Sequence, residues 1–166
     1  MLKKRLGLIC TVLLVAVLLC ACRSDTAGKV SLYDLKSKMA SATDKFSDMT
    51  YASHEDTDAE SIFKNISDMS YSKVHSYCIY YATNGTGNAD EIAVIQVKNA
   101  GDLTAARQSL EAHLQKRKSL YSTYDKSQLK KLESARVVTG GDCAALIVAD
   151  DADAISDAFH NFFNGE

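Results

Sequence analysis

The feature that most constrains the fold is a unit of two β-rich stretches and a helix, which occurs twice in the second half of the chain. Residues 74–98 contain two β-rich stretches around a turn at 84–88, and residues 136–149 contain two more around Gly140 and Gly141. Such pairs predict β-hairpins. Apolar residues at helical spacing follow each pair. The sequence therefore predicts an α+β fold with a four-stranded antiparallel sheet in ββαββα-like order and its helices on one face.

The two units align at an offset of 52 residues. The similarity indicates either an ancestral duplication or only the demands that such a unit places on any sequence, and both interpretations stay open. The aligned residues are Asp90, Ala93, Ile95, Leu103, Thr104, Ala106 and Leu110 in the first unit, and Asp142, Ala145, Ile147, Ile155, Ser156, Ala158 and Phe162 in the second.

Residues 31–70 are expected to form an N-terminal helical segment that precedes the α+β domain of residues 71–166. Ser31 can cap a first helix, whose apolar residues recur at helical spacing. A loop with some strand character is expected at residues 49–53. A short helix around Phe63 should follow it.

Residues 1–21 have the pattern of a lipoprotein signal peptide. Basic residues near the N-terminus precede an apolar run of 14 residues, 6–19, which is shorter than the about 20 residues that a membrane-spanning helix needs. The run ends in Leu19-Cys20-Ala21-Cys22, the pattern of a lipobox. This pattern predicts cleavage between Ala21 and Cys22 and a diacylglyceryl group on Cys22. The alternative is an ordinary secretory signal cut elsewhere, or an uncleaved anchor.

The predicted lipid places the mature chain on the extracytoplasmic face of the cell membrane, with residues 22–30 as a polar tether. Two acyl chains suffice for stable anchoring, at about 0.8 kcal/mol per buried CH₂. Removal of the three basic residues of the signal leaves 16 basic and 21 acidic residues, a net charge of −5. This charge disfavours nucleic acid and anionic lipid surfaces as partners. We therefore expect the membrane contact to be made by diacylglyceryl-Cys22.

Two cysteines, Cys78 and Cys143, lie beyond the signal peptide and Cys22, and each falls in a predicted strand. An extracytoplasmic pair can form a disulfide. We favour two buried thiols that act as small apolar residues.

Two acidic clusters resemble parts of calcium loops. His54–Glu60 has acidic residues at alternate positions, but Ser61 and Ser67 stand where such a loop needs Gly and Glu. Asp150–Asp153 holds three carboxylates. Carboxylates at the start of a helix satisfy its first N–H groups and its dipole. We therefore expect helix caps here, with no metal ion and no cofactor.

The sequence contains no Gly-x-Ser-x-Gly, His-Glu-x-x-His or phosphate-loop motif. His75 and Cys78 lie three apart on a predicted strand and so point to opposite faces. His113 and Arg117 share one face of the long helix, where they could hold a phosphate or carboxylate; a solvated face is the simpler interpretation. We expect no catalytic residue and no enzymatic activity.

Tyr77, Ile79 and Tyr81 alternate along the first predicted strand and therefore share one face of the sheet. If helices cover only the other face, these side chains form an exposed, rigid aromatic surface of the kind that protein or glycan partners bind. If the N-terminal helix or residues 49–53 cover them, they belong to the core.

Three stretches carry a family resemblance: Ala89–Lys98, Gln115–Tyr124 with Leu129, and Val137–Asp150. In them the chain resembles a family of small bacterial lipoproteins catalogued as domain of unknown function 4358, over most of residues 71–163. Cys143 stands where the family has an aromatic residue, and the expected proline after Tyr124 is absent. The resemblance implies an envelope-exposed lipoprotein of a Gram-positive bacterium, and it supplies no activity or catalytic residue.

The expected function is binding, as an accessory module for another envelope protein. A solute- or peptide-binding lipoprotein is the alternative, and it requires a closed pocket. An enzyme acting on envelope polymers is less favoured. It requires a cleft lined by paired carboxylates or histidine, with Glu91 or the acidic cluster near Asp150 in its wall.

Overall fold

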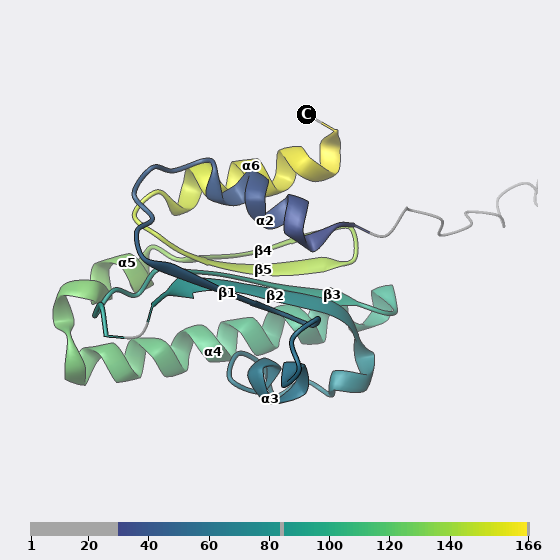
Figure 1. The fold of residues 1–166 in the computed structure, drawn as a ribbon, viewed down its shortest axis with the longest axis horizontal. Coiled ribbons are helices and arrows are strands. Elements are labelled where there is room, and N and C mark those ends of the chain that lie inside the picture. Colours follow the sequence, from purple (N-terminus) through teal and green to yellow (C-terminus); the bar gives the residue numbers. More distant parts are fainter. Residues whose placement is uncertain (1–29, 84, 166) are drawn as a thin grey trace, which may run out of the picture. The chain divides into compact units, whose positions relative to one another are not determined.

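Five antiparallel strands form one sheet, in the order β1-β2-β3-β5-β4 (Figure 1). The structure is a computed structural model and describes residues 30–83 and 85–165. Short 3₁₀ turns at Tyr71–Lys73, Ala100–Asp102 and Lys126–Gln128 connect some of the elements. In chain order, the elements are α2 (Leu32–Ala40), β1 (Met49–Ser53), α3 (Ala59–Phe63), β2 (Val74–Ala82), β3 (Glu91–Val97), α4 (Leu103–Tyr124), α5 (Leu129–Glu133), β4 (Arg136–Gly140), β5 (Cys143–Val148) and α6 (Ala152–Asn164).

Both predicted hairpins are present, as β2–β3 and β4–β5, but the prediction of four strands is wrong. The fifth strand is β1, which pairs antiparallel with β2 from Met49 opposite Ala82 to Ser53 opposite Cys78. Residues 31–70 are therefore not a separate helical segment. They supply an edge strand to the same sheet, and Ser31–Glu166 forms one compact unit.

Helices cover both faces of the sheet, not one face as predicted (Figure 1). Helices α2 and α6 lie on one face, and α3, α4 and α5 lie on the other. The reason is that every residue of β3 and β5 is buried. Strands buried on both faces need cover on both faces, and they read as continuous apolar runs. The runs Ile92–Ile95 and Ala144–Val148 carry that signal.

The helices bury an apolar core on each face. On the α4 face, Ile95 and Leu146 of the sheet are fully buried with Leu110 of α4. On the other face, Leu35 of α2 and Phe159 of α6 are fully buried. Each fully buried aliphatic or aromatic side chain contributes about 1.5–3 kcal/mol relative to exposure, so both layers stabilise the sheet.

Two of the three residues of the predicted aromatic surface are buried. Tyr77 is fully buried and Ile79 is 4% exposed. The Tyr77 ring lies 5.3 Å from that of Phe63, and its hydroxyl donates to the carbonyl oxygen of Ala59 at 2.6 Å. The cover thus comes from α3, and not from α2 or β1. Only Tyr81 keeps partial exposure.

Cys78 and Cys143 are buried free thiols, as we favoured. They lie on β2 and β5, which are separated by β3. Neighbouring strands are about 4.8 Å apart, so the two residues are separated by about 10 Å. A disulfide needs Cα atoms within about 7 Å. This arrangement therefore excludes a disulfide between Cys78 and Cys143.

The helix caps follow the sequence in part. Ser31 caps α2 as predicted, and its hydroxyl accepts a hydrogen bond from the Asp34 amide at 3.2 Å. Asp102 lies at the N-cap position of α4, but its side chain makes no capping hydrogen bond. It pairs instead with Lys73, at 2.8 Å.

Candidate functional site

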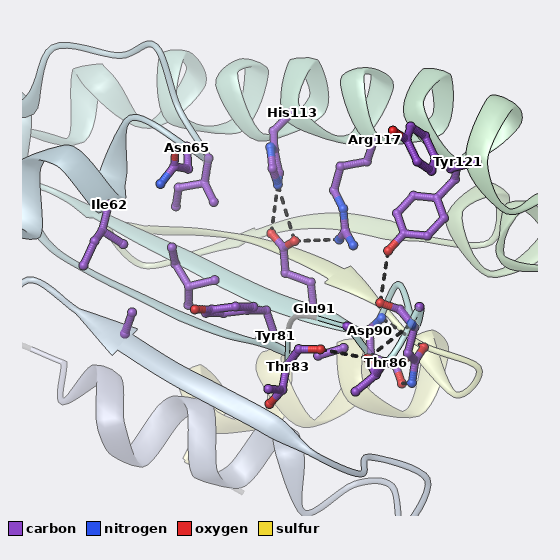
Figure 2. A pocket seen from close by; sticks show the side chains of 18 residues that line it. Ile62, Asn65, Tyr81, Thr83, Thr86, Asp90, Glu91, His113, Arg117 and Tyr121 are labelled. Atoms are coloured by element: carbon purple, nitrogen blue, oxygen red, sulfur yellow. Dashed lines mark hydrogen bonds and ion pairs between the residues drawn. The ribbon is translucent and has the colours of Figure 1, made fainter.

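A cavity of about 780 Å³ lies where β2 ends and β3 begins, beneath the second half of α4 (Figure 2). This volume falls within the range of small-molecule sites, about 300–1,000 Å³. Thr83 and residues 85–88, between β2 and β3, form one rim. Asn65 and Ile66, which lie just after α3, form another part of the wall. The aromatic side chains of the wall are Tyr81, Tyr121 and Tyr124.

Glu91 is a deeply buried charged residue of the cavity wall, with 5% exposure; its neighbour Asp90, which also lines the cavity, is 3% exposed. One carboxylate oxygen lies 3.0 Å from His113 Nε2, and the other accepts a hydrogen bond from Arg117 Nη1 at 2.5 Å. Arg117 Nη2 also donates to the carbonyl oxygen of Ala89 at 3.0 Å. A buried carboxylate without such partners would lose several kcal/mol of hydration. Both oxygens of Glu91 are therefore held by its neighbours.

The local structure explains why these three side chains meet. Glu91 is the first residue of β3, and β3 lies beneath α4. His113 and Arg117 are four residues apart, so they project from one helix face one turn apart. Their side chains are only 13% and 14% exposed. The shared helix face was predicted correctly, whereas its interpretation as a solvated face is wrong.

The pKa of Glu91 reflects a balance of opposed effects. Burial raises the pKa of Glu91. The hydrogen bond with His113 and the charge of Arg117 lower this pKa by more, so that it lies below the ordinary value of 4.5. Glu91 is therefore ionised at neutral pH. The site holds a buried ion pair, not a neutral acid ready to donate a proton.

Tyrosine side chains define the rest of the cavity. The Tyr121 hydroxyl donates to the carbonyl oxygen of Asn88 at 3.1 Å, and the Arg117 guanidinium lies 5.7 Å from the centre of the Tyr121 ring. These contacts fix the ring beside the ion pair. Tyr81 projects from β2 into the cavity (Figure 2). Tyr124 lies at the rim and is 84% exposed.

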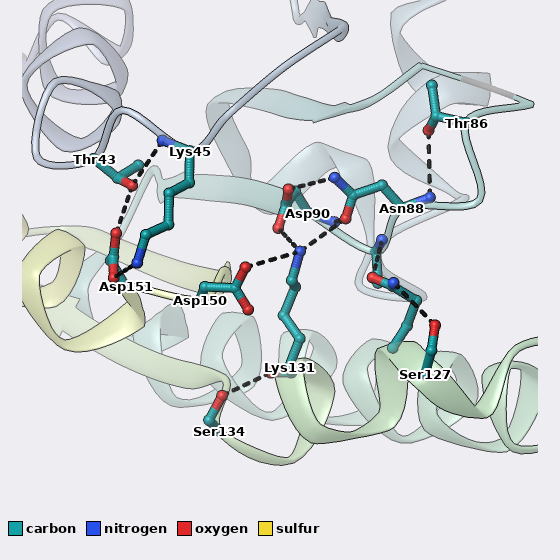
Figure 3. Close-up of polar contacts among 12 residues, drawn as sticks. Thr43, Lys45, Thr86, Asn88, Asp90, Ser127, Lys131, Ser134, Asp150 and Asp151 are labelled. Carbon is teal, nitrogen blue, oxygen red and sulfur yellow. Dashed lines mark hydrogen bonds and ion pairs between the residues drawn. The ribbon is translucent and has the colours of Figure 1, made fainter.

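A second polar cluster supports the β2–β3 loop from the other side (Figure 3). Lys131 Nζ lies 2.7 Å from Asp90 and 2.8 Å from the side-chain oxygen of Asn88. Asn88 donates in turn to Asp90 at 2.6 Å. The side chain of Asp90 is only 4% exposed, and Lys131 balances its charge within the protein. The cluster ties the loop that carries Asn88 to α5.

The sequence profile of the family described as Domain of unknown function (DUF4358) matches residues 47–149. The chain belongs to this family. The matched segment begins two residues before β1 and contains all five strands. It also contains Glu91, His113 and Arg117, so the whole charged site lies within the DUF4358 domain. The chain has no significant match among curated proteins or among solved structures.

The two acidic clusters do not line the cavity. Asp58 and Asp151 lie at the N-cap positions of α3 and α6, as expected, but neither side chain makes a capping hydrogen bond. In the part of the chain that the structure describes, no group of three or more His, Cys, Asp and Glu residues is placed to hold a metal ion. The carboxylate of Asp56 accepts a hydrogen bond from the Ser53 amide at 2.7 Å. The pairs near α6 are Asp150 with Lys131, Asp151 with Lys45, and Asp153 with Arg136 (Figure 3 shows the first two).

Sequence reasoning identified part of this site. Glu91 lines the cavity, as the enzyme hypothesis required, whereas Asp150 does not. Tyr121 lies four residues after Arg117, and this spacing was a usable signal that the two side chains share one helix face. Cys22 and the predicted cleavage site lie outside the described residues. Within residues 30–83 and 85–165, no helix has the length and apolar character needed to cross a bilayer.

Proposed function

We propose that this protein is a lipid-anchored lipoprotein of the cell envelope whose domain binds a small ligand in the Glu91 cavity. The observation that carries the proposal is a cavity of about 780 Å³ that combines tyrosine rings with a buried, fully partnered charge cluster. Concave sites with apolar walls and a few converging polar groups are the usual form of ligand sites. The solute-binding hypothesis required a closed pocket. The cavity is partly open to solvent, but its volume and lining support ligand binding over the accessory-module role.

Binding suits this site better than catalysis. Both oxygens of Glu91 are occupied by His113 and Arg117, so neither is directed at a ligand. A general base needs a lone pair within hydrogen-bond reach of the proton that it removes. We infer that Glu91 is a positioning residue, which orients His113 and Arg117 toward the cavity.

The lipobox at Leu19-Cys20-Ala21-Cys22 supports the anchored location. Cys22→Ala should move the protein from the membrane fraction to the soluble fraction and abolish incorporation of labelled palmitate. In the wild type, the lipid on Cys22 and the short tether would keep the ligand-binding domain near the membrane surface. A Cys22→Ala protein that stays in the membrane fraction, together with a wild-type protein that takes up no palmitate, would contradict the lipid anchor.

Ligand binding is tested with the full chain in detergent and a mixture of small sugars, peptides and carboxylates, by saturation-transfer NMR. Hits at the cavity should be lost in His113→Gln. His160→Gln is the matched control, because His160 is exposed on α6, on the opposite face of the sheet. Hits that both variants retain would contradict binding in this cavity.

An accessory module for another envelope protein is the second candidate. Leu120 and Tyr124, next to the cavity, are 54% and 84% exposed, and exposed apolar side chains of this size are typical of docking surfaces. Crosslinking in membranes tests it. One dominant partner that Leu120→Glu removes would favour this role over ligand capture.

A further inference from the structure

We infer that the ligand of the Glu91 cavity is an uncharged carbohydrate of one or two sugar rings. This inference rests on the proposed function and narrows it to a ligand class. Three properties of the cavity carry it: the balance of its charges, its tyrosine rings, and its unused hydrogen-bonding groups.

The charges of the described cavity wall are matched within the protein. The wall contains two acids and one arginine, with no lysine. Glu91 pairs with Arg117, and Asp90 pairs with Lys131 behind the wall. An anionic ligand that approached Arg117 would meet the carboxylate of Glu91, and a cation that approached Glu91 would meet Arg117. Such like-charge contacts are costly where water is partly excluded, so the site favours an uncharged ligand.

The tyrosine rings favour a ligand with an apolar face. Tyr81 and Tyr121 extend into the cavity from β2 and α4 (Figure 2), and the exposed Tyr124 also lines it. Tyrosine offers a large apolar ring and a polar hydroxyl on a side chain with few rotatable bonds. A sugar ring has the matching character, because its C–H faces are apolar and its edge carries hydroxyl groups.

Hydrogen-bonding groups remain available at the wall. Among the described residues, neither the side-chain amide of Asn65 nor the Tyr81 hydroxyl has a hydrogen-bond partner. Arg117 has five N–H donors, of which two are used by Glu91 and Ala89. Amide and hydroxyl groups both donate and accept, as sugar hydroxyls do. The set fits a polyhydroxylated ligand.

A peptide fits the cavity less well. One recurring way in which an extended peptide binds is by adding a strand to an exposed sheet edge. The strand residues of the cavity wall come mainly from β2 and β3, which are paired on both sides, so that Tyr81 lies opposite Thr50 of β1 and Glu91 of β3. The edge strand β1 contributes Ala52. The wall therefore offers mainly side chains of paired strands, which favours a sugar over an added peptide strand.

The test measures binding of chitobiose, cellobiose and maltose to the full chain by isothermal titration calorimetry, in a detergent without a sugar headgroup. Trialanine, glutarate and inorganic phosphate are the comparison probes. At least one disaccharide should bind, and Asn65→Ala and Tyr81→Ala should each weaken it about fivefold or more, since a lost hydrogen bond costs about 1 kcal/mol. Tyr33→Ala is the control, because Tyr33 is an exposed tyrosine on α2, across the sheet.

Ionic strength provides a second readout. The affinity for an uncharged ligand should change less than about twofold between 0.05 and 0.5 M salt, because only interactions between charges are screened. Disaccharide binding that persists in Asn65→Ala and Tyr81→Ala would overturn the inference, as would absence of binding by every disaccharide. Binding of trialanine, glutarate or phosphate that Arg117→Met abolishes would overturn the sugar class but keep the cavity as a binding site. Absence of any binding at the cavity would overturn both proposals.

Discussion

Replacing Glu91 with glutamine tests whether an ionised carboxylate holds the cavity wall together. The substitution keeps the size of the side chain and removes its charge. The guanidinium of Arg117, whose side chain is only 14% exposed, would then face a neutral amide in place of a carboxylate oxygen at 2.5 Å. Removal of one partner from a buried ion pair costs about 3–5 kcal/mol. Arg117 keeps its hydrogen bond to Ala89, so we expect the lower end, about 3 kcal/mol.

The free energy of unfolding is measured by urea titration of the full chain, followed by far-UV circular dichroism because the chain has no tryptophan. For a domain of this size, about 3 kcal/mol corresponds to a decrease in Tm of roughly 10 °C. Glu111→Gln is the matched control on the same helix. Glu111 pairs with Arg107 on the surface, where both side chains are more than 40% exposed, and it should change stability by less than about 1 kcal/mol.

The pH dependence identifies the ionised form as the stabilising one. The pKa of Glu91 is lower in the folded state than its ordinary value of 4.5. Its stabilisation is therefore complete above the unfolded-state pKa and is lost as the pH falls through the folded-state pKa. The difference in unfolding free energy between wild type and Glu91→Gln should shrink below pH 4.5. Equal stabilities at pH 7, or a difference that persists unchanged in acid, would refute the reasoning.

Two further predictions concern packing. Gly140→Ala would place a Cβ atom 2.6 Å from a ring carbon of Phe163, and such overpacking should cost about 1–3 kcal/mol in urea unfolding; Gly101→Ala, which meets no atom within 4 Å, should leave the packing unchanged. Burial raises the pKa of Cys78 to about 12 and also raises that of Cys143. Neither thiol should react with a disulfide reagent at pH 8 until urea unfolds the chain, and rapid reaction of the native protein would show that they are accessible.

The hairpins and helices could be predicted because their signals are local. Alternation, turn residues and helical spacing identify β2–β3 and β4–β5 without knowledge of the rest of the chain. Strand β1 has five residues, and its pairing with β2 involves residues that are about thirty positions away. Its identity as a strand depends on that contact. The second helical layer was predictable from the run Ile92–Ile95, which is apolar at every position.

The site was only partly predictable for the same reason. The four-residue spacing of His113 and Arg117 establishes that they share a helix face. Their contact with Glu91 depends on how α4 crosses β3, which no local pattern specifies. The burial of Tyr77 likewise depends on α3, which is connected to β2 through residues 64–73. Patterns identified the faces of elements, and tertiary packing decided what each face meets.

The structure also bears on the similarity between the two ββα units. Ile95 faces α4, within the core on that side of the sheet. Its aligned residue, Ile147, lies opposite Ile92 in the register of β3 and β5. Ile92 is three residues from Ile95 on one strand and therefore faces the other way. Aligned residues thus serve opposite faces, which favours shared local demands over a symmetric duplication as the source of the similarity.

The residues of α4 that line the cavity lie in the part of this helix that extends beyond α6 in the alignment of the two ββα units. Helix α4 spans 22 residues, whereas α6 spans 13 and ends at Asn164, which aligns with Ala112. His113, Arg117 and Tyr121 all lie in the part of α4 that extends beyond the residues aligned with α6. The first part of α4 buries one face of the sheet, and α6 buries the other face. The later turns of α4 extend over the start of β3, and their side chains line the cavity.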